Sequence, residues 1–292
     1  MLPRTPLSRL SPRERANFLL TNRIPRRCAT LFMGWFSRLR NPLVRHVSIA
    51  VWELFAGDLR LHEARKARFA SMHDCFIREL KPGARPVAVD PGVLISPCDG
   101  VIGAFGAVRG TEVFQTKGLP YTLAELLGDN ALAARYRDGV FVTLRLKTNM
   151  YHRFHAPEAG NLREVRYLAG DTWNVNPIAV KCIERLYCRN ARAVLELHLY
   201  GSPHRVALVP VGAILVASIV VHGLDMPLDL HYHGRARLPC PRHYERGGEM
   251  GYFQQGSTII VLAGPGFALV PDLREGVVVR MGQPLLVKPR TG

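Results

Sequence analysis

Hydrophobic and polar positions along the chain follow two different periods, and the change falls near residue 80. Up to Leu80, apolar residues recur every three or four positions among charged ones, which is typical of amphipathic helices. Ser11 followed by Pro12 and an acid at position 14 predicts a helix start, with Ser11 as its cap. A second helix is predicted from Val51 to about Leu80, where Pro82 and the glycine after it end the pattern.

Beyond residue 87, short apolar or β-branched runs are separated by Gly, Pro and Asp, which indicates strands. The predicted strands are Val93–Ile95, Val101–Phe105, Val140–Leu146, Leu162–Tyr167, Ala193–Leu199, Val206–Val211, Ile214–Val221, Thr258–Leu262, Val277–Arg280 and Leu285–Val287, with short helices at Leu123–Leu127 and Pro177–Leu186. We therefore expect an α+β protein in which amphipathic helices in residues 1–80 precede a β-rich domain in residues 81–292. That domain should be a mostly antiparallel β sandwich or barrel-like structure.

Composition adds a strong positive charge to this picture. The 292 residues carry a formal net charge of +16, while 48% hydrophobic and 21% charged residues exclude wholesale disorder. Such a charge favours anionic partners such as nucleic acid, anionic lipid or phosphorylated substrates. Arginines dominate residues 1–50, where Leu31, Phe32, Trp35, Phe36 and Leu39 recur at helical spacing. This pattern favours a helix in a membrane interface, or one that packs its apolar side on the domain.

Targeting and cysteine signals point to an intracellular protein. The six cysteines have no C-x-x-C spacing and no evident pairing pattern, so we expect reduced thiols and not a disulfide framework or a zinc site. The apolar run from Val211 to Val221 is too short to cross a membrane and predicts one buried strand. No signal peptide is predicted; an arginine-rich transit peptide is a compositional alternative.

Three polar stretches interrupt the β-rich part and could carry chemistry. They are Ser96–Gly100, Met150–Pro157 with its two histidines, and Gly256-Ser257-Thr258 in front of an apolar run. Each alone is typical of a turn or a surface loop. An aspartate, a histidine and a serine can form a nucleophilic triad, but chain order does not show that the three side chains meet.

The wording and order of these motifs resemble bacterial phosphatidylserine decarboxylase proenzymes of the longer, membrane-associated type. The resemblance is carried by Ser96-Pro97-Cys98-Asp99-Gly100, Tyr151-His152-Arg153-Phe154-His155-Ala156-Pro157, Gly170-Asp171 through Val175-Asn176-Pro177, Arg189-Asn190, Val211-Gly212-Ala213, and Gly248-Glu249-Met250-Gly251 leading to Gly256-Ser257-Thr258. One departure is visible, because Gln255 stands where the family usually has leucine. The motifs span about residues 80–266.

The resemblance implies a self-processing enzyme. Ser257 would attack the carbonyl of Gly256 after His155 takes its proton, with Asp99 orienting His155. The chain would be cut between residues 256 and 257, and Ser257 would become a pyruvoyl group, the covalent cofactor of a small chain that stays with the large one. Phosphatidylserine would then be decarboxylated to phosphatidylethanolamine through a Schiff base. His152 is our candidate for the proton donor to the substrate carbon.

The resemblance also implies partners and a location. Phosphatidylserine and an anionic membrane surface would be the partners of the basic leader, with the protein peripheral on the cytoplasmic face of a bacterial inner membrane. A homo-oligomer stays open. No metal is expected, and no nucleic-acid motif is present, so we expect no nucleic-acid partner.

Alternatives remain open at this point. Another phosphoserine lipid could be the substrate. His152, His155, His231 and His233 could instead form a metal site, with the last two on one face of a strand. A third reading is a basic module that only binds membrane or nucleic acid.

Overall fold

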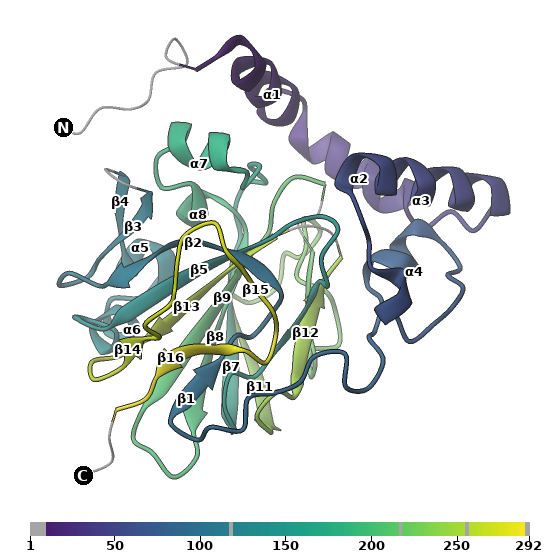
Figure 1. Cartoon of the computed structure of the whole chain (residues 1–292). Coiled ribbons are helices and arrows are strands. Elements are labelled where there is room, and N and C mark those ends of the chain that lie inside the picture. Colours follow the sequence, from purple (N-terminus) through teal and green to yellow (C-terminus); the bar gives the residue numbers. More distant parts are fainter. Residues whose placement is uncertain (1–9, 117–118, 216–217, 255–256, 290–292) are drawn as a thin grey trace.

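Helices at the N-terminal end cover one end of a mostly antiparallel β domain, which confirms the predicted α+β class (Figure 1). The computed structural model describes residues 10–116, 119–215, 218–254 and 257–289. Gln255, the departure from the family pattern, and Gly256, the glycine expected at the cut, lie outside the described residues. The N-terminal helices are α1 (Pro12–Asn22), α2 (Arg26–Phe36), α3 (Pro42–Ala56) and α4 (Met72–Phe76).

The predicted start of α1 is confirmed in detail. Ser11 Oγ accepts a hydrogen bond from Glu14 N at 3.3 Å, and the Glu14 carboxylate accepts one from Ser11 N at 3.0 Å. Each side chain thus satisfies a backbone N–H group that has no partner within the helix.

The single helix predicted from Val51 to Leu80 is wrong. Helix α3 ends at Ala56 because Gly57 has a φ of 82°, a conformation that glycine adopts without strain. A short 3₁₀ turn (Leu61–Glu63) follows, and Ser71 caps the separate helix α4. An apolar period alone did not reveal this break, because apolar side chains of the connection also enter the small core around Trp52.

The main sheet has eight antiparallel strands in the order β11-β7-β8-β9-β13-β5-β2-β15, so it is open and is not a closed barrel. Its strands are β2 (Gly100–Ala107), β5 (Val140–Leu146), β7 (Gly160–Leu168), β8 (Arg192–Leu199), β9 (Arg205–Val211), β11 (Arg237–Tyr244), β13 (Ser257–Ala263) and β15 (Val278–Val279). One smaller sheet has the order β1 (Val93–Ile95), β16 (Pro284–Val287), β14 (Ala268–Leu269). Another has the order β10 (Ile219–Val221), β12 (Glu249–Phe253), β6 (Arg153–His155). Strands β3 (Glu112–Thr116) and β4 (Leu119–Thr122) form a two-stranded sheet. The remaining helices are α5 (Leu123–Leu127), α6 (Asn130–Arg135), α7 (Pro177–Cys182) and α8 (Leu186–Arg189).

Strand β13 is central and buried on both faces. Ile259 and Val261 enter one hydrophobic core, whereas Ile260 and Leu262 enter a second core on the opposite face. Its backbone pairs with β5 on one side and with β9 on the other. A segment that begins at Ser257 is therefore held by two ladders of hydrogen bonds and by both cores.

The prediction of one strand from Val211 to Val221 is wrong. Strand β9 ends at Val211 and β10 begins only at Ile219. Between them Leu215 has a φ of 68°, which interrupts extended backbone. The predicted helix Pro177–Leu186 is likewise divided into α7 and α8, with Arg185 at a φ of 54°.

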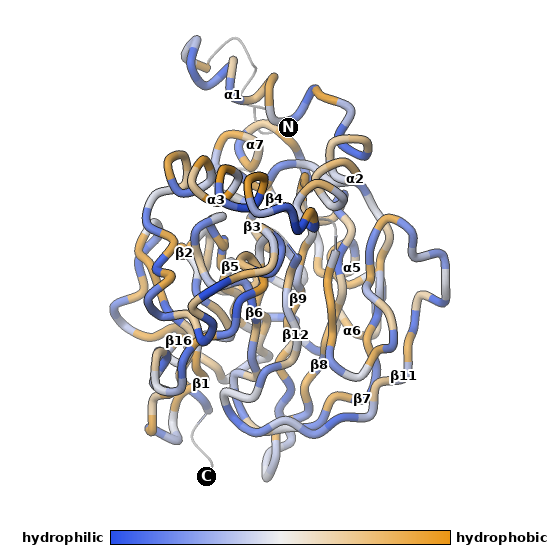
Figure 2. The backbone as a smooth tube through the Cα atoms, turned by 90° about the vertical axis from the view of Figure 1, so that its right-hand side faces the viewer, coloured by the Kyte–Doolittle hydropathy of each residue, from blue (hydrophilic) through white to orange (hydrophobic). Residues whose placement is uncertain are grey.

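Two observations bear on the predictions about membrane-spanning segments and cysteines. Within the described part of the chain, every helix is too short or too polar to cross a bilayer. All six cysteine thiols are free. Figure 2 shows α1, α2 and α3 together at one end of the molecule, with several hydrophobic stretches along them.

Candidate active site

Ser257 is the first residue of β13 and lies opposite Leu146 of β5. Its side chain is fully buried, and its Oγ has no hydrogen-bond partner among the described residues. A buried hydroxyl without a partner is costly, and a chemical role is one explanation for keeping it. Ser257 also lines a cavity of about 530 Å³.

The cavity has an apolar roof and a polar, basic wall. Side chains of α2, α3 and α4 form the roof, namely Met33, Trp52, Phe55, Met72 and Phe76. The wall includes Arg145, Lys147 and three asparagines at positions 149, 174 and 176. Burial lowers the pKa of Arg145 below its usual value, although an arginine in this range keeps its charge. A ligand with an anionic head and an apolar body fits such a lining.

His152 is a buried imidazole with one free nitrogen. Its Nδ1 lies 2.8 Å from Met150 O, and because a carbonyl only accepts, Nδ1 carries the proton. Its Nε2 has no partner among the described residues. The ring packs against Phe76, a residue of the cavity roof, with 4.0 Å between centroids and a tilt of 35° between the ring planes. Burial, aided by the charge of Arg78, lowers the pKa of His152 to about 3, so the ring is neutral with a lone pair on Nε2.

His155 is also neutral, but both of its nitrogens are engaged. Nδ1 donates to Gly247 O at 2.9 Å, so Nε2 accepts from the Tyr151 hydroxyl at 3.0 Å. Burial lowers the pKa of His155, while the Gly247 carbonyl and the charges of Glu249 and Asp99 act in the opposite direction. The ring is thus in the form of a base, with its lone pair shared with Tyr151.

Asp99 is held by a cation from outside its own motif. The Arg85 guanidinium donates to both carboxylate oxygens, and Met281 N donates to Oδ1 at 3.0 Å. Arg85 also pairs with Glu63 at 2.8 Å. The turn that carries Asp99 reaches the histidine strand through the backbone, because His155 N donates to Pro97 O at 2.8 Å.

The structure therefore brings the predicted residues into one region without joining all of them. Asp99 and His155 are linked through backbone and charge. Among the described residues, no hydrogen bond joins Asp99 to His155 or either histidine to Ser257. The scissile Gly256 is outside the described residues. The roles of Asp99, His152, His155 and Ser257 stay predictions.

The alternative metal site receives no support from the arrangement. His231 and His233 lie in turns and loops and not on a strand, because Asp229 Oδ1 accepts from His231 N and closes a local turn. The strand prediction for this pair is wrong. In the described residues, no group of three or more His, Cys, Asp or Glu side chains is arranged to hold a metal ion.

Sequence reasoning missed several neighbours of the site. Arg85 stands in a Pro- and Gly-rich loop with no local sign of a charge partner. Tyr151 directly precedes His152 in the motif, and that position could have marked it as a partner of a histidine. Arg145 lies near the end of the buried strand β5 and Lys147 directly follows it, so the change from apolar to basic residues there was a usable signal.

Comparisons with known proteins agree with the motifs. The phosphatidylserine decarboxylase family matches residues 72–287 of the chain. A phosphatidylserine decarboxylase proenzyme of Bordetella pertussis is 40% identical over 234 residues, which cover 76% of this chain and 77% of that protein. The proenzyme of Pseudomonas fluorescens is 43% identical over 219 residues, covering 72% and 75%. That of Methylococcus capsulatus is 35% identical over 271 residues, covering 89% and 92%.

Proposed function

The chain belongs to the phosphatidylserine decarboxylase family, and from this membership we propose that it converts phosphatidylserine to phosphatidylethanolamine after cutting itself at Ser257. The observation that carries the proposal is the position of Ser257. A fully buried serine with an unpartnered hydroxyl begins a central strand and opens on a cavity with an apolar roof and basic walls.

Self-cleavage needs a base for the Ser257 hydroxyl, and His155 is proposed for this role. Its neutral ring has a lone pair on Nε2, which becomes available once the Tyr151 hydroxyl turns away. Ser257 Oγ attacks the Gly256 carbonyl, His155 takes the proton and passes it to the leaving nitrogen, and the amide becomes an ester. The negative charge of Asp99 favours the protonated histidine that forms in this step.

The ester is then lost by elimination. The Ser257 Cα proton leaves and the Cβ–O bond breaks, which frees the Gly256 carboxylate and leaves a dehydroalanine that water converts to a pyruvoyl group with release of ammonia. The small chain would remain in place because β13 pairs on both sides and enters both cores. Large and small chains are therefore proposed to stay associated.

The surroundings of Ser257 fit a pyruvoyl group. Among the described residues, Ser257 Oγ makes no hydrogen bond, and Ser257 lines the cavity that a substrate could enter. When present, the group would condense with the substrate amine and accept the electrons left when carbon dioxide departs.

His152 is proposed as the residue that carries the proton. Its Nε2 has no partner among the described residues, so this atom is free to carry a proton and would deliver it to the substrate carbon that loses the carboxylate. The low pKa of His152 suits this role, because a weakly basic imidazole gives its proton up readily.

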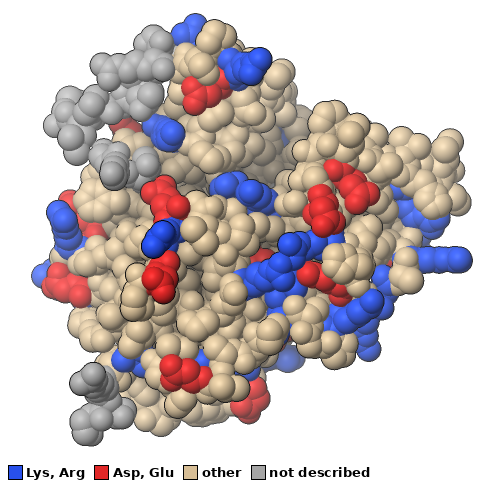
Figure 3. All heavy atoms as spheres, viewed as in Figure 1, with Lys and Arg blue, Asp and Glu red and all other residues tan. Residues whose placement is uncertain are grey.

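The lipid is proposed to reach the cavity from a membrane against α2 and α3. These helices expose Leu31, Phe32, Trp35, Leu43, Val47, Val51, Leu54 and Phe55, each at least 44% exposed. Phe55 also lines the cavity roof, so the exposed apolar surface continues into the site. Lys and Arg side chains gather below α3 in Figure 3, where they would attract anionic lipid. Arg145 and Lys147 would hold the phosphate and carboxylate groups.

This arrangement supports a peripheral protein, proposed to lie on the cytoplasmic face of a bacterial inner membrane. The test is the release of carbon dioxide from phosphatidylserine in mixed vesicles, with Ser257→Ala as the matched inactive variant. We expect phosphatidylethanolamine from the wild-type protein and none from Ser257→Ala. Equal product from both proteins would overturn the proposal. A parallel arm with soluble phosphoserine tests whether the lipid part is required.

A further inference from the structure

Helix α2 has two faces with different contacts. Its outward side chains include Phe32 and Trp35, each 60% exposed. Its inward face carries Thr30, which is 7% exposed and whose Oγ1 accepts a hydrogen bond from Leu215 N at 3.0 Å. Two turns further along, just past the end of the helix, Arg38 donates to Gln254 Oε1 at 2.7 Å. Helix α2 therefore contacts the loop after β9, and Arg38, two residues past its end, contacts the segment that precedes Ser257.

Leu215 is held in a strained conformation at this contact. Its φ of 68° places a leucine in the left-handed region, which favours glycine and is unfavourable for a side chain with a Cβ. Such conformations persist only when surrounding contacts determine them. The hydrogen bond from Leu215 N to Thr30 is a contact of that kind, and it comes from a helix 185 residues away in the chain.

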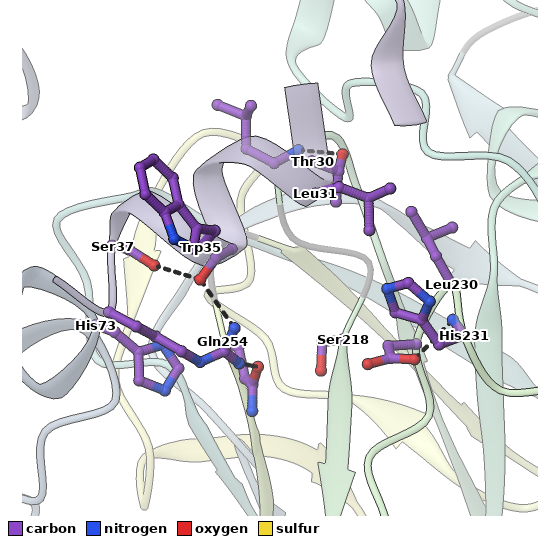
Figure 4. Close-up of a pocket in the computed structure, with 13 residues that line it drawn as sticks. Thr30, Leu31, Trp35, Ser37, His73, Ser218, Leu230, His231 and Gln254 are labelled. Atoms are coloured by element: carbon purple, nitrogen blue, oxygen red, sulfur yellow. Dashed lines mark hydrogen bonds between the residues drawn. The ribbon is translucent and has the colours of Figure 1, made fainter. Parts of the chain in front are cut away.

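Leu215 also separates two cavities that flank the cleavage segment. It lines the cavity that contains Ser257, and it lines a second cavity of about 370 Å³ under α2. Figure 4 shows this second cavity, with Thr30 above it and Ser218 and Gln254 across from α2. Gln254 N donates to Ser218 O at 3.2 Å, so the loop that contains Leu215 is tied to the residue three positions before Ser257.

We propose that α2 is part of the processing site, and that Thr30 is a positioning residue that fixes the cleavage segment by holding Leu215 in its left-handed conformation. The inference rests on the proposed self-cleavage at Ser257. Two hydrogen bonds carry the inference: Leu215 N donates to Thr30, and Gln254 N donates to Ser218 O. Ser218 is three residues after Leu215 in the chain, and Gln254 is three residues before Ser257. Because the other face of α2 carries the exposed aromatic residues, the helix that would meet the membrane also sets the geometry of the cut.

The test follows the conversion of newly made full-length chain into two chains over time, on denaturing gels. Thr30→Val keeps the shape of the side chain but removes the acceptor, and we expect it to slow processing about tenfold, the effect of losing one hydrogen bond to a buried group. Thr30→Ser keeps the hydroxyl and should process at the wild-type rate. Thr21→Val, on α1, is the matched control and should also process normally, since its hydroxyl bonds only within its own helix.

Leu215→Asn separates positioning from general stability, because asparagine adopts the left-handed conformation more easily than leucine. In that background, Thr30→Val should slow processing less than about threefold. This outcome supports the proposal even if Thr30→Val alone lowers the unfolding temperature. Wild-type processing by Thr30→Val, or an undiminished defect in the Leu215→Asn background, would overturn it. If the wild-type chain is never cut, the proposed function fails before Thr30 is tested.

Discussion

The Arg85 guanidinium donates to both oxygens of the Asp99 carboxylate, with N···O distances from 2.6 to 3.1 Å. Both side chains are buried, at 4% and 7% exposure. The motif aspartate is thus paired with a cation from the loop that follows the N-terminal helices, and that cation also reaches Glu63 within the helical region. The pairing ties the two parts of the chain together beside the candidate site.

Replacing Arg85 should destabilise the folded protein. We expect Arg85→Met to lower the free energy of unfolding by about 3 kcal/mol, because it leaves the buried Asp99 carboxylate without its countercharge. The double variant Arg85→Met with Asp99→Asn should recover part of this loss. Arg65→Met is the control, because Arg65 is 69% exposed and its pair with Glu79 contributes little. Denaturant unfolding is measured for these three variants and their parent, all with Ser257→Ala so that the chain stays whole. Equal losses for Arg85→Met and Arg65→Met would contradict a buried pair between Arg85 and Asp99.

His155 should be required for processing. We expect His155→Gln to slow the appearance of two chains by about 10²–10⁴-fold, the usual contribution of a general base. His243→Gln is a matched control on β11, where the ring is 43% exposed and contacts Glu245. A gel time course after synthesis gives both rates. Processing of His155→Gln at the rate of the control would remove His155 from the proposed role.

Stability should fall at mildly acidic pH because of His152. Folding lowers its pKa from 6.5 to about 3, so below pH 6.5 the unfolded chain binds a proton that the folded chain does not. Stability from this group is fully present above pH 6.5 and declines as the pH falls. At about pH 5 the loss is about 2 kcal/mol.

The measurement compares the loss of unfolding free energy between about pH 7.5 and pH 5 for two proteins. Both carry Ser257→Ala so that the chain stays whole, and one also carries His152→Phe. The His152→Phe protein should lose about 2 kcal/mol less. An identical pH dependence in the two proteins would show that the ring is not held neutral by the fold.

Apolar side chains on α2 and α3 should determine vesicle binding. Trp35 and Leu54 are 60% and 79% exposed, and we expect the double change to serine to weaken binding to anionic vesicles by about 100-fold, from the apolar area that no longer leaves water. Val89→Ser is the control, because Val89 is 95% exposed but lies outside these helices. Vesicle sedimentation gives the affinities. Unchanged binding of the double variant would exclude this surface as the membrane contact.

Local patterns in the sequence predicted much of the β domain and failed at identifiable places. Strands at Val93–Ile95 and Val140–Leu146 were predicted to the residue, because apolar runs bounded by turn residues specify them. Strand β11 was missed, since Pro239 and Pro241 and its exposed side chains remove the pattern of a buried strand. The break at Leu215 was missed because hydropathy carries no information on φ, and a tertiary contact with Thr30 holds it.

The sequence also predicted some residues of the candidate site and missed others. Motif order gave Asp99, His152, His155 and Ser257 as candidates. His155 bonds to the turn that carries Asp99, and His152 packs on Phe76, which lines the same cavity as Ser257. Motif order could not identify Arg85 or Tyr151 as partners of these residues, because hydrogen bonds between distant segments depend on packing. The free Nε2 of His152 and the free Oγ of Ser257 are likewise properties of burial and not of sequence.

The intact mass of the purified protein under denaturing conditions tests self-cleavage and pyruvoyl formation at Ser257 together. We expect two chains, residues 1–256 and residues 257–292, and the small chain should be lighter than a form with an N-terminal serine by the mass of one ammonia molecule. Ser257→Ala should give a single chain of 292 residues. A wild-type protein that remains one chain of 292 residues, or a small chain that keeps an unmodified serine at its start, would contradict the account.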